Sequence, residues 1–346
     1  MILQYPLHQD LRNPALLTQL QCKLNNQTKP PSSLGQLEIL AQQLGLILQT
    51  ESPILQNPQL VVFAGDHGLA KHGISAYPSD VTWQMVENFL SGGAAVSVLA
   101  RQHLIALTVV DCGVRHDFKP QSGLRICKIA DGTADALTQP AMSTEQCERA
   151  IANGQDLIKT LPGNALLLGE MGIGNTSAAS LLLARLGGLS IEQCVGAGTG
   201  LDQGGIQRKT KILQQVLQLH AYASKPLQAL AAFGGFEIAT MVGAILEATA
   251  NNRVIVVDGF ITGAAVLVAS RLESLVLQRC VFAHRSAERG HALLLEQLGA
   301  QPLLDLQLRL GEGSGAALAW PLLVSACSLL TQMASFTSAG VLQASA

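Results

Sequence analysis

Glu312 has the setting in this sequence that is best suited to acid–base chemistry. It lies between two glycines in residues 309–315 (RLGEGSG) and is the last charged residue of the 346-residue chain. A carboxylate beside a long uncharged segment is poorly solvated, which raises its proton affinity and suits a general base. The same pattern also fits a glutamate in a solvent-exposed turn, so the residues alone leave both interpretations open.

Residues 169–177 (GEMGIGNTS) have the composition of a loop that holds a phosphate. Gly172 and Gly174 let the backbone approach a ligand closely because they have no Cβ atom. Free N–H groups at the start of the next helix attract an anion. The side chain that caps this helix can come from Asn175, Thr176 or Ser177. An ordinary capped turn explains these residues equally well.

Residues 196–205 (GAGTGLDQGG) form a second glycine-rich segment, which precedes a helical pattern containing Arg208 and Lys209. The glycines permit close backbone approach, and a cation can neutralise a phosphate. The segment is neither a Walker A loop nor a clean GxGxxG fingerprint. On its own it is therefore a weak indication of nucleotide binding.

The elements that must position these loops are predicted by five short apolar runs, each ending in polar or glycine residues. The runs are residues 60–64, 105–110, 165–168, 254–257 and 277–282. Strands that are apolar on both faces belong to a parallel sheet covered on both sides. Ligands bind beyond the carboxyl ends of such strands. We expect five polar residues to converge there: Asp66, Asp111, Glu170, Asp258 and Ser286.

Segments with helical spacing alternate with these runs and predict a doubly wound α/β fold. They are residues 82–101, 143–160, 176–187, 205–220 and 236–250. We expect a large α/β domain over residues 56–305. Residues 1–55 and 306–346 should pack together as a small helical domain, with a pair of buried helices at the C-terminal end.

Charged residues are scarce, at 13% of the chain against about 25% in an average soluble domain. The hydrophobic content of 48% excludes intrinsic disorder. The balance of 22 Lys and Arg against 24 Asp and Glu argues against a nucleic-acid partner. Residues 316–333 are apolar enough to suggest a membrane span, but Pro321 and several polar residues favour a buried helix.

The cysteines and histidines point to a cytoplasmic protein without a metal. Seven scattered cysteines with no CxxC pair indicate reduced thiols. The histidines form no HExxH or His-x-His pattern, so no metal site is expected. The N-terminus lacks a basic segment followed by an apolar core, and we expect no signal peptide there.

Taken together, the motifs resemble those of the nicotinate-nucleotide:dimethylbenzimidazole phosphoribosyltransferase family, and the resemblance runs in order along nearly the whole chain. The segments that carry it are KPPSSLGQLE (29–38), FAGDHGLAKHGISAYP (63–78), GGAAVSVLAR (92–101), GEMGIGNTS (169–177), GAGTGLD (196–202), FGGFEIATMVGAI (233–245), DGFITGAA (258–265) and RLGEGSGAALA (309–319).

The resemblance implies an activity and an assembly. Family members transfer the 5-phosphoribosyl group from nicotinate mononucleotide to 5,6-dimethylbenzimidazole during cobalamin synthesis, giving α-ribazole 5′-phosphate and nicotinate. A Rossmann-like sheet with a small helical domain, a homodimer, and no metal or cofactor are implied as well. The pyridinium leaving group is already cationic, so one carboxylate that accepts the proton of the incoming base is sufficient.

The resemblance also implies roles for single residues. The glutamate of the GEG motif, proposed as the base, corresponds to Glu312, and Glu170 and Lys209 are implied near the reacting groups. The aromatic base is expected beside Tyr77, Gln84 and Leu310. The phosphoribosyl group is expected to contact Gly172, Gly174, Asn175, Thr176, Ser177, Gly198, Gly200, Asp202, Asp258 and Ser286.

Two alternatives come from the residues themselves. Residues 254–264 (VIVVDGFITGA) are faintly similar to the loop of diphosphate-dependent phosphoribosyltransferases. That loop has two adjacent acidic residues, whereas only Asp258 is present here, and a strand, a turn and a helix capped by Thr262 explain the segment better. The uncharged C-terminal tail suggests the other alternative, a non-enzymatic nucleotide-binding or membrane-associated protein.

Overall fold

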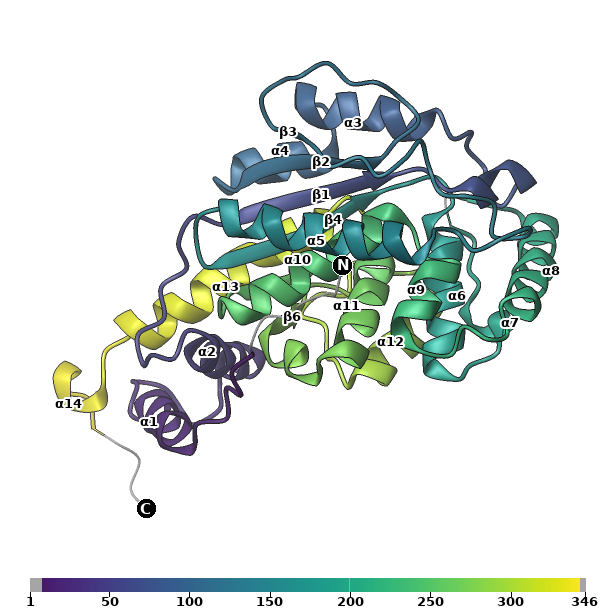
Figure 1. Cartoon of the computed structure of the whole chain (residues 1–346). Helices are drawn as coiled ribbons and strands as arrows, with labels where there is room; N and C mark the ends of the chain where they lie inside the picture. The colour runs from purple at the N-terminus through teal and green to yellow at the C-terminus, as the bar shows by residue number, and fades with distance from the viewer. Residues whose placement is uncertain (1–7, 199, 343–346) are drawn as a thin grey trace.

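A six-stranded, fully parallel sheet forms the centre of the molecule in the computed structural model, which describes residues 8–198 and 200–342 (Figure 1). The strands are β1 (Gln59–Gly65), β2 (Ala106–Gly113), β3 (Leu124–Ile126), β4 (Ala165–Met171), β5 (Val254–Val257) and β6 (Cys280–Phe282). Their order is β3-β2-β1-β4-β5-β6. This is the doubly wound Rossmann order, in which the winding reverses between β1 and β4, so the predicted fold class is confirmed.

The strands agree with the sequence except at the two edges of the sheet. Residues 274–279, which overlap the run predicted as a strand, form the 3-10 helix η2 (Ser274–Arg279), and β6 begins only at Cys280. The Glu273 side chain accepts the Leu275 N–H at the start of η2 and favours this turn. The short strand β3 was not predicted, because three residues with two exposed side chains show no readable alternation.

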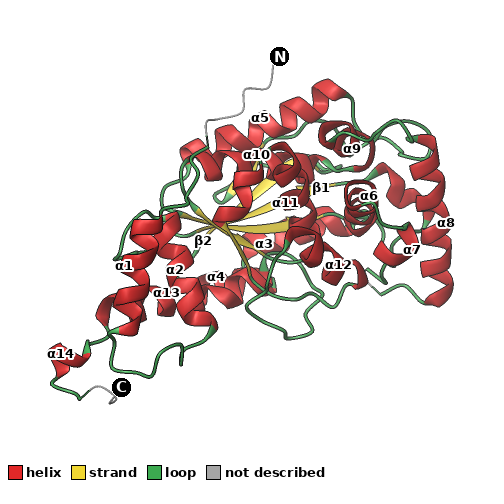
Figure 2. Cartoon of the chain, turned by 90° about the horizontal axis from the view of Figure 1, so that it is seen from below, coloured by secondary structure: helices red, strands yellow, loops and turns green. Residues whose placement is uncertain are grey.

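Alternate strand residues pack into two separate apolar layers. Phe63, Leu168 and Val257 face the layer formed by α5 (Thr144–Thr160), α6 (Asn175–Gly187), α9 (Pro226–Phe233), α10 (Phe236–Ala250), α11 (Phe260–Leu272) and α12 (Arg289–Leu298). Val62, Leu167 and Val256 face the other layer, which contains α1 (Pro14–Asn25), α2 (Gln36–Ile47), α3 (Val81–Ser91), α4 (Ala95–Gln102) and α13 (Ser314–Gln332). Figure 2 shows the strands between these two sets of helices.

The remaining helices are short or lie at the periphery. They are η1 (Gly68–His72), α7 (Ile191–Cys194), α8 (Gln203–Leu219) and α14 (Phe336–Ala339). The helix predicted over residues 82–101 is interrupted. Gly92 ends α3 with φ +83°, a left-handed conformation that glycine adopts without a steric penalty.

The two ends of the chain pack against each other through α2 and α13. The Thr28 N–H also donates to the Ala334 carbonyl at 3.0 Å. Both helices share one apolar layer with the sheet, and the proposed division at residues 56 and 305 stays a prediction. The first seven residues, where no signal peptide was expected, and residues 343–346 lie outside the described chain.

The predicted C-terminal pair of helices is instead one 19-residue helix, α13, followed by the four-residue α14. Pro321 lies inside α13 without ending it. Within the described chain, α13 is the one helix long and apolar enough to cross a membrane. One side of it is buried against α2, α4 and β4 through Trp320, Leu323 and Leu330, as expected for a core helix.

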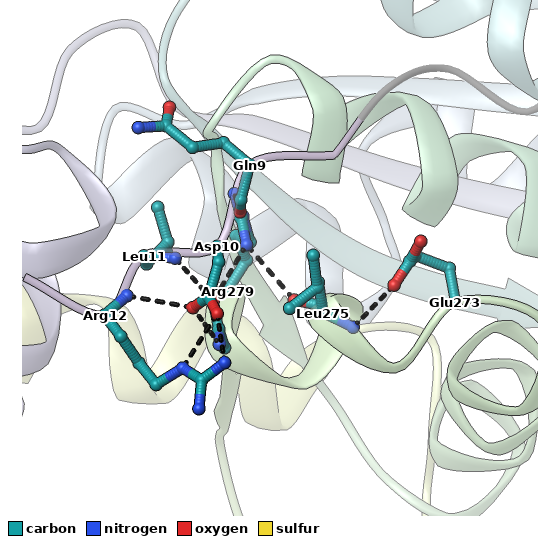
Figure 3. Close-up of polar contacts among 8 residues, drawn as sticks. Gln9, Asp10, Leu11, Arg12, Glu273, Leu275 and Arg279 are labelled. Atoms are coloured by element: carbon teal, nitrogen blue, oxygen red, sulfur yellow. Dashed lines mark hydrogen bonds and ion pairs between the residues drawn. The ribbon is translucent and has the colours of Figure 1, made fainter.

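A buried arginine fastens the N-terminal segment to the sheet edge (Figure 3). Arg279 is fully buried, and its guanidinium donates to the Asn252 side chain at 2.8 Å and to the Gln9 carbonyl. The neighbouring Leu11 N–H donates to Gln278 at 2.8 Å. These bonds tie residues 9–11 to η2, because a buried guanidinium must keep its partners.

Candidate active site

A cavity of about 400 Å³ opens beyond the carboxyl ends of β4, β5 and β6. Such a position is the usual ligand site of open α/β sheets. Its walls come from the segments after these three strands, from α3, and from residues 309–312. Ten of the predicted site residues line it: Tyr77, Glu170, Gly172, Asn175, Thr176, Gly198, Asp258, Ser286, Leu310 and Glu312.

Six predicted site residues lie outside this lining, and their binding roles stay predictions. Lys209 lies behind Thr176, and Gln84 is exposed on α3. Gly174 (φ +99°) precedes α6, while Ser177 is buried inside that helix. Asp202 caps α8 by accepting the Gly205 N–H at 2.7 Å, and the nearby Gly200 has φ +122°.

Asp66 and Asp111 lie at this edge of the sheet, as expected, and accept backbone hydrogen bonds there. Asp66 accepts the Arg115 N–H at 2.8 Å, and Asp111 accepts the Val114 N–H at 2.8 Å. Neither residue lines the cavity. Both satisfy backbone N–H groups of the turn that follows β2.

Glu312 lies in a loop whose backbone is held in an unusual conformation. Gly311, Glu312 and Gly313 all have positive φ, at +79°, +67° and +92°. Such a conformation is uncommon for glutamate. Gly169 of β4 makes room for the loop, since a Cβ atom there would lie 2.3 Å from the Glu312 carbonyl oxygen. The loop therefore packs directly on the sheet and holds Glu312 at the cavity wall.

The Glu312 carboxyl group is set up to exchange a proton near neutral pH. Only 6% of the residue is exposed, and its Oε2 has no hydrogen-bond partner in the described part of the chain. The pKa of Glu312 is raised to about 7, because burial and the charge of Asp258 together outweigh a backbone hydrogen bond from Val96 that lowers it. A carboxylate with an unpartnered oxygen and a pKa near 7 can act as a general base.

Glu170 contacts the same loop from the end of β4. Its Oε2 accepts a hydrogen bond from the Asn175 amide, and the Glu312 backbone donates to its carboxyl group. A Cβ atom at Gly311 would lie 2.2 Å from Glu170 Oε1, which is why that position requires glycine. Burial and the charge of Asp258 raise the pKa of Glu170 to about 8. Glu170 is therefore mostly protonated at neutral pH in the free protein.

Asp258 is the third carboxyl group of the site and is fully buried after β5. Its Oδ1 lies 3.6 Å from His284 Nε2. A Cβ atom at Gly315 would lie 2.0 Å from the His284 ring and 2.8 Å from Asp258 Oδ1. Burial raises the pKa of Asp258, while the charge of His284 and hydrogen bonds from the start of α13 lower it.

A buried lysine lies beside the start of α6. Lys209 is fully buried, and its Nζ donates to Thr176 Oγ1 at 2.9 Å. Gly198 (φ +55°) is packed against both residues, since a Cβ atom there would lie 3.1 Å from Thr176 Oγ1 and 3.6 Å from Lys209 Nζ. Burial lowers the pKa of Lys209 to about 8. The helix start and this cation form a site suited to a phosphate.

The cavity also has apolar lining residues that are suited to contact an aromatic ring. Tyr77 and Leu310 are about half exposed at its mouth, and Val81 and Met85 of α3 lie beside them. Sequence reasoning had missed Val81 and Met85. Their spacing of four residues on a helix was the signal that would have found them.

Further lining residues that were missed are Phe260, Ile261, Thr262, His284, Glu288 and Arg309. His284 and Glu288 flank Ser286 at every second position, which was a readable signal. Within residues 8–198 and 200–342, no group of three or more His, Cys, Asp or Glu side chains is arranged to hold a metal ion.

Comparison with known proteins identifies similar chains over nearly the full length. The sequence model of a phosphoribosyltransferase family matches residues 11–341. The nicotinate-nucleotide–dimethylbenzimidazole phosphoribosyltransferase of Variovorax paradoxus is 65% identical, over 97% of this chain and 96% of that protein. The protein of the same name from Cupriavidus necator is 56% identical, over 96% of each chain. The crystal structure of CobT from Thermus thermophilus superposes with a TM-score of 0.91 at 39% identity, covering 96% of this chain and 100% of that one.

Proposed function

Because the chain belongs to the nicotinate-nucleotide–dimethylbenzimidazole phosphoribosyltransferase family, we propose that it transfers the 5-phosphoribosyl group of nicotinate mononucleotide to 5,6-dimethylbenzimidazole. The products are α-ribazole 5′-phosphate, used in cobalamin assembly, and nicotinate. One observation carries the assignment of the site: Glu312, whose buried Oε2 has no partner in the described part of the chain, lines the same cavity as apolar Leu310 and as Thr176, which binds Lys209.

The proposed reaction is a single displacement at C1′. The bond between C1′ and the pyridinium nitrogen breaks, and its electron pair neutralises that nitrogen as nicotinate leaves. A ring nitrogen of the benzimidazole forms the new bond from the opposite face, which inverts C1′ from β to α. The other ring nitrogen loses its proton to Glu312, whose pKa of about 7 matches this transfer.

Glu170 and the phosphate site are proposed to hold the ribosyl group during this displacement. Positive charge develops on the ribose ring, as in glycoside hydrolysis. The positive pyridinium nitrogen at C1′ favours the ionised form of Glu170, which can then stabilise the charge that develops on the ribose. Thr176, Gly198 and Lys209 are proposed to bind the 5′-phosphate, which orients C1′ between the two rings.

The assignment is tested by incubating the protein with nicotinate mononucleotide and dimethylbenzimidazole in EDTA and separating the products by chromatography. We expect equal amounts of nicotinate and α-ribazole phosphate. Nicotinate release without the second product would mean that water is the acceptor. Activity with phosphoribosyl diphosphate and Mg²⁺ alone would support the diphosphate-dependent alternative instead.

The homodimer, the cytoplasmic location and the independence from metal and cofactor belong to the same proposal. All seven cysteines are free, which favours a reducing compartment. Light scattering on the purified protein tests the dimer, and a monomer at assay concentrations would contradict it. A panel of benzimidazoles, purines and phenols in the same assay identifies the preferred acceptor.

A further inference from the structure

Glu288 is a buried carboxylate of the cavity wall to which the reaction above gives no role. Only 8% of the residue is exposed, and it lines the cavity two positions after Ser286. In the described part of the chain, its carboxylate has no hydrogen-bond or ion-pair partner. The charge of Glu288 acts on Lys209 without forming an ion pair. Its carboxylate is therefore available at the cavity wall for a hydrogen bond from a ligand.

The backbone around Glu288 is held in place from several sides. The Glu288 N–H donates to Ser286 Oγ at 3.2 Å, and the Ser286 N–H donates to His291 Nδ1 at 2.7 Å. Burial lowers the pKa of His291 to about 3, so the ring is neutral and can accept this bond. Glu288 precedes α12 but does not cap it with its side chain. The side chain of Glu288 is therefore not used in capping the helix, and hydrogen bonds hold the backbone that carries it.

The glycine-rich loop that contains Gly196 and Gly198 packs closely against the Glu288 carboxylate. A Cβ atom at Gly196 would lie 2.4 Å from Glu288 Oε2, and one at Gly290 would lie 2.6 Å from the Cys194 carbonyl. The segment after β6 thus packs tightly on the loop that carries Gly198. Glu288 is placed beside the proposed phosphate site, close to Lys209 but beyond contact with it.

The chemistry of the two substrates limits which of their groups can donate a hydrogen bond to Glu288. A carboxylate accepts hydrogen bonds and donates none when ionised. The proton of the benzimidazole is already assigned to Glu312. The remaining donors on the two substrates are the 2′- and 3′-hydroxyl groups of the ribose, which is attached to the phosphate. Carboxylates bind ribose hydroxyls in the same way in dinucleotide-binding folds.

We propose that Glu288 binds a ribose hydroxyl of the nucleotide and so selects a ribonucleotide as the donor. The proposal rests on the proposed function, because it assigns a residue to the donor of that reaction. Glu288 contributes by holding the sugar, and it does not exchange a proton with the reacting atoms. The 5′-phosphate and the hydroxyl then fix the ribose at two points.

The test compares nicotinate mononucleotide with its 2′-deoxy and 3′-deoxy derivatives in the wild type, Glu288→Gln and Glu288→Ala. The ratio of kcat/KM between the parent and each derivative is measured in each protein. Comparing ratios between variants cancels the intrinsic reactivity of each sugar. Glu296→Ala, an exposed glutamate of the same helix, is the matched control.

We expect the ratio of kcat/KM between the parent and one derivative to be about 10- to 100-fold larger in the wild type than in Glu288→Ala. This is the range expected for a hydrogen bond to a charged group. Glu288→Gln, which keeps an acceptor of the same shape, should fall between the two. Unchanged ratios for both derivatives in Glu288→Ala would overturn the proposal. Unchanged ratios combined with an equal loss of kcat/KM for all three donors would mean that Glu288 acts through Lys209 and not on the ribose.

Turnover of the wild type with the parent nucleotide is measured in the same experiment. No turnover there contradicts the proposed function, whereas turnover with unchanged ratios contradicts only the role of Glu288. Circular dichroism and calorimetric binding of the parent nucleotide show that each variant is folded. If Glu288→Ala is not folded, the ratios measured for Glu288→Gln decide the question.

Discussion

Asp258 Oδ1 accepts the Ala316 N–H at 3.0 Å and so ties the end of β5 to the first turn of α13. Ala316 lies four residues after Glu312, and the two are separated by the glycines and serine of one tight turn. A buried carboxylate at the start of a helix satisfies N–H groups that have no partner within the helix. Asp258 thereby fixes the loop that presents Glu312, and its charge raises the pKa of Glu312.

Asp258→Asn should move the pH dependence of the reaction to lower pH. In the wild type, kcat/KM should rise with pH through a pKa near 7, because Glu312 must be deprotonated to accept the proton. Asparagine keeps an oxygen for the Ala316 N–H and removes the negative charge that raises the pKa of Glu312. The measurement is the pH profile of kcat/KM in both proteins. An acidic limb that stays in place or moves to higher pH would refute this electrostatic role.

Glu312→Gln should lower kcat by about 10²- to 10⁴-fold, the usual contribution of a positioned general base. The affinity for nicotinate mononucleotide should change little, because the amide has nearly the shape of the carboxyl group. Stopped assays give kcat and calorimetry gives the affinity, with the exposed Glu296→Gln as the control. Full activity in Glu312→Gln would remove this residue from the role of base.

Lys209→Met should weaken the binding of nicotinate mononucleotide while leaving the fold intact. The long apolar side chain fills the buried position, but it has no charge for the phosphate and no donor for Thr176. In the wild type, affinity should also fall above about pH 8, where Lys209 loses its proton. Calorimetric titrations from pH 6 to 9 measure both effects. Lys211→Met, an exposed lysine of the same helix, is the control. A normal affinity in Lys209→Met would contradict the phosphate site.

Glu170→Gln should make the protein more stable relative to the wild type as the pH rises. The pKa of Glu170 is about 8 in the folded protein against an ordinary value of 4.5. The folded state therefore binds the proton more tightly than the unfolded state does. The resulting contribution of Glu170 to the free energy of unfolding is complete below pH 4.5 and is lost as the pH rises through 8. Glutamine stays neutral throughout.

Urea denaturation of the wild type and Glu170→Gln at pH 5 and pH 8 measures this difference. The free energy of unfolding of the variant minus that of the wild type should increase from pH 5 to pH 8 by an amount on the order of a few kcal/mol. A gap that is the same at both pH values would show that Glu170 is already ionised in the folded protein.

The ends of the strands show which structural features the local sequence pattern can predict and which it cannot. The runs before Gly65, Glu170 and Asp258 are short, apolar and abruptly terminated, so hydrophobic periodicity predicts both the strands and the polar residues at their tips. The same reasoning failed at residues 277–279, where buried Arg279 and the Glu273 cap favour a 3-10 turn. It correctly placed Asp66 and Asp111 at the edge of the sheet, but it could not show that they lie outside the cavity, where each accepts a backbone N–H through one oxygen.

By itself, the sequence determined the α/β class, the order of the glycine-rich loops and the family, because these depend on residues that are close together along the chain. Only the tertiary structure decided which carboxylates share one cavity. Glu170, Asp258 and Glu312 come from three distant segments. Burial raises all three pKa values, and the charge of Asp258 also raises those of Glu170 and Glu312. Burial and distance through space depend on how the sheet stacks these segments, so neither can be read from positions along the chain.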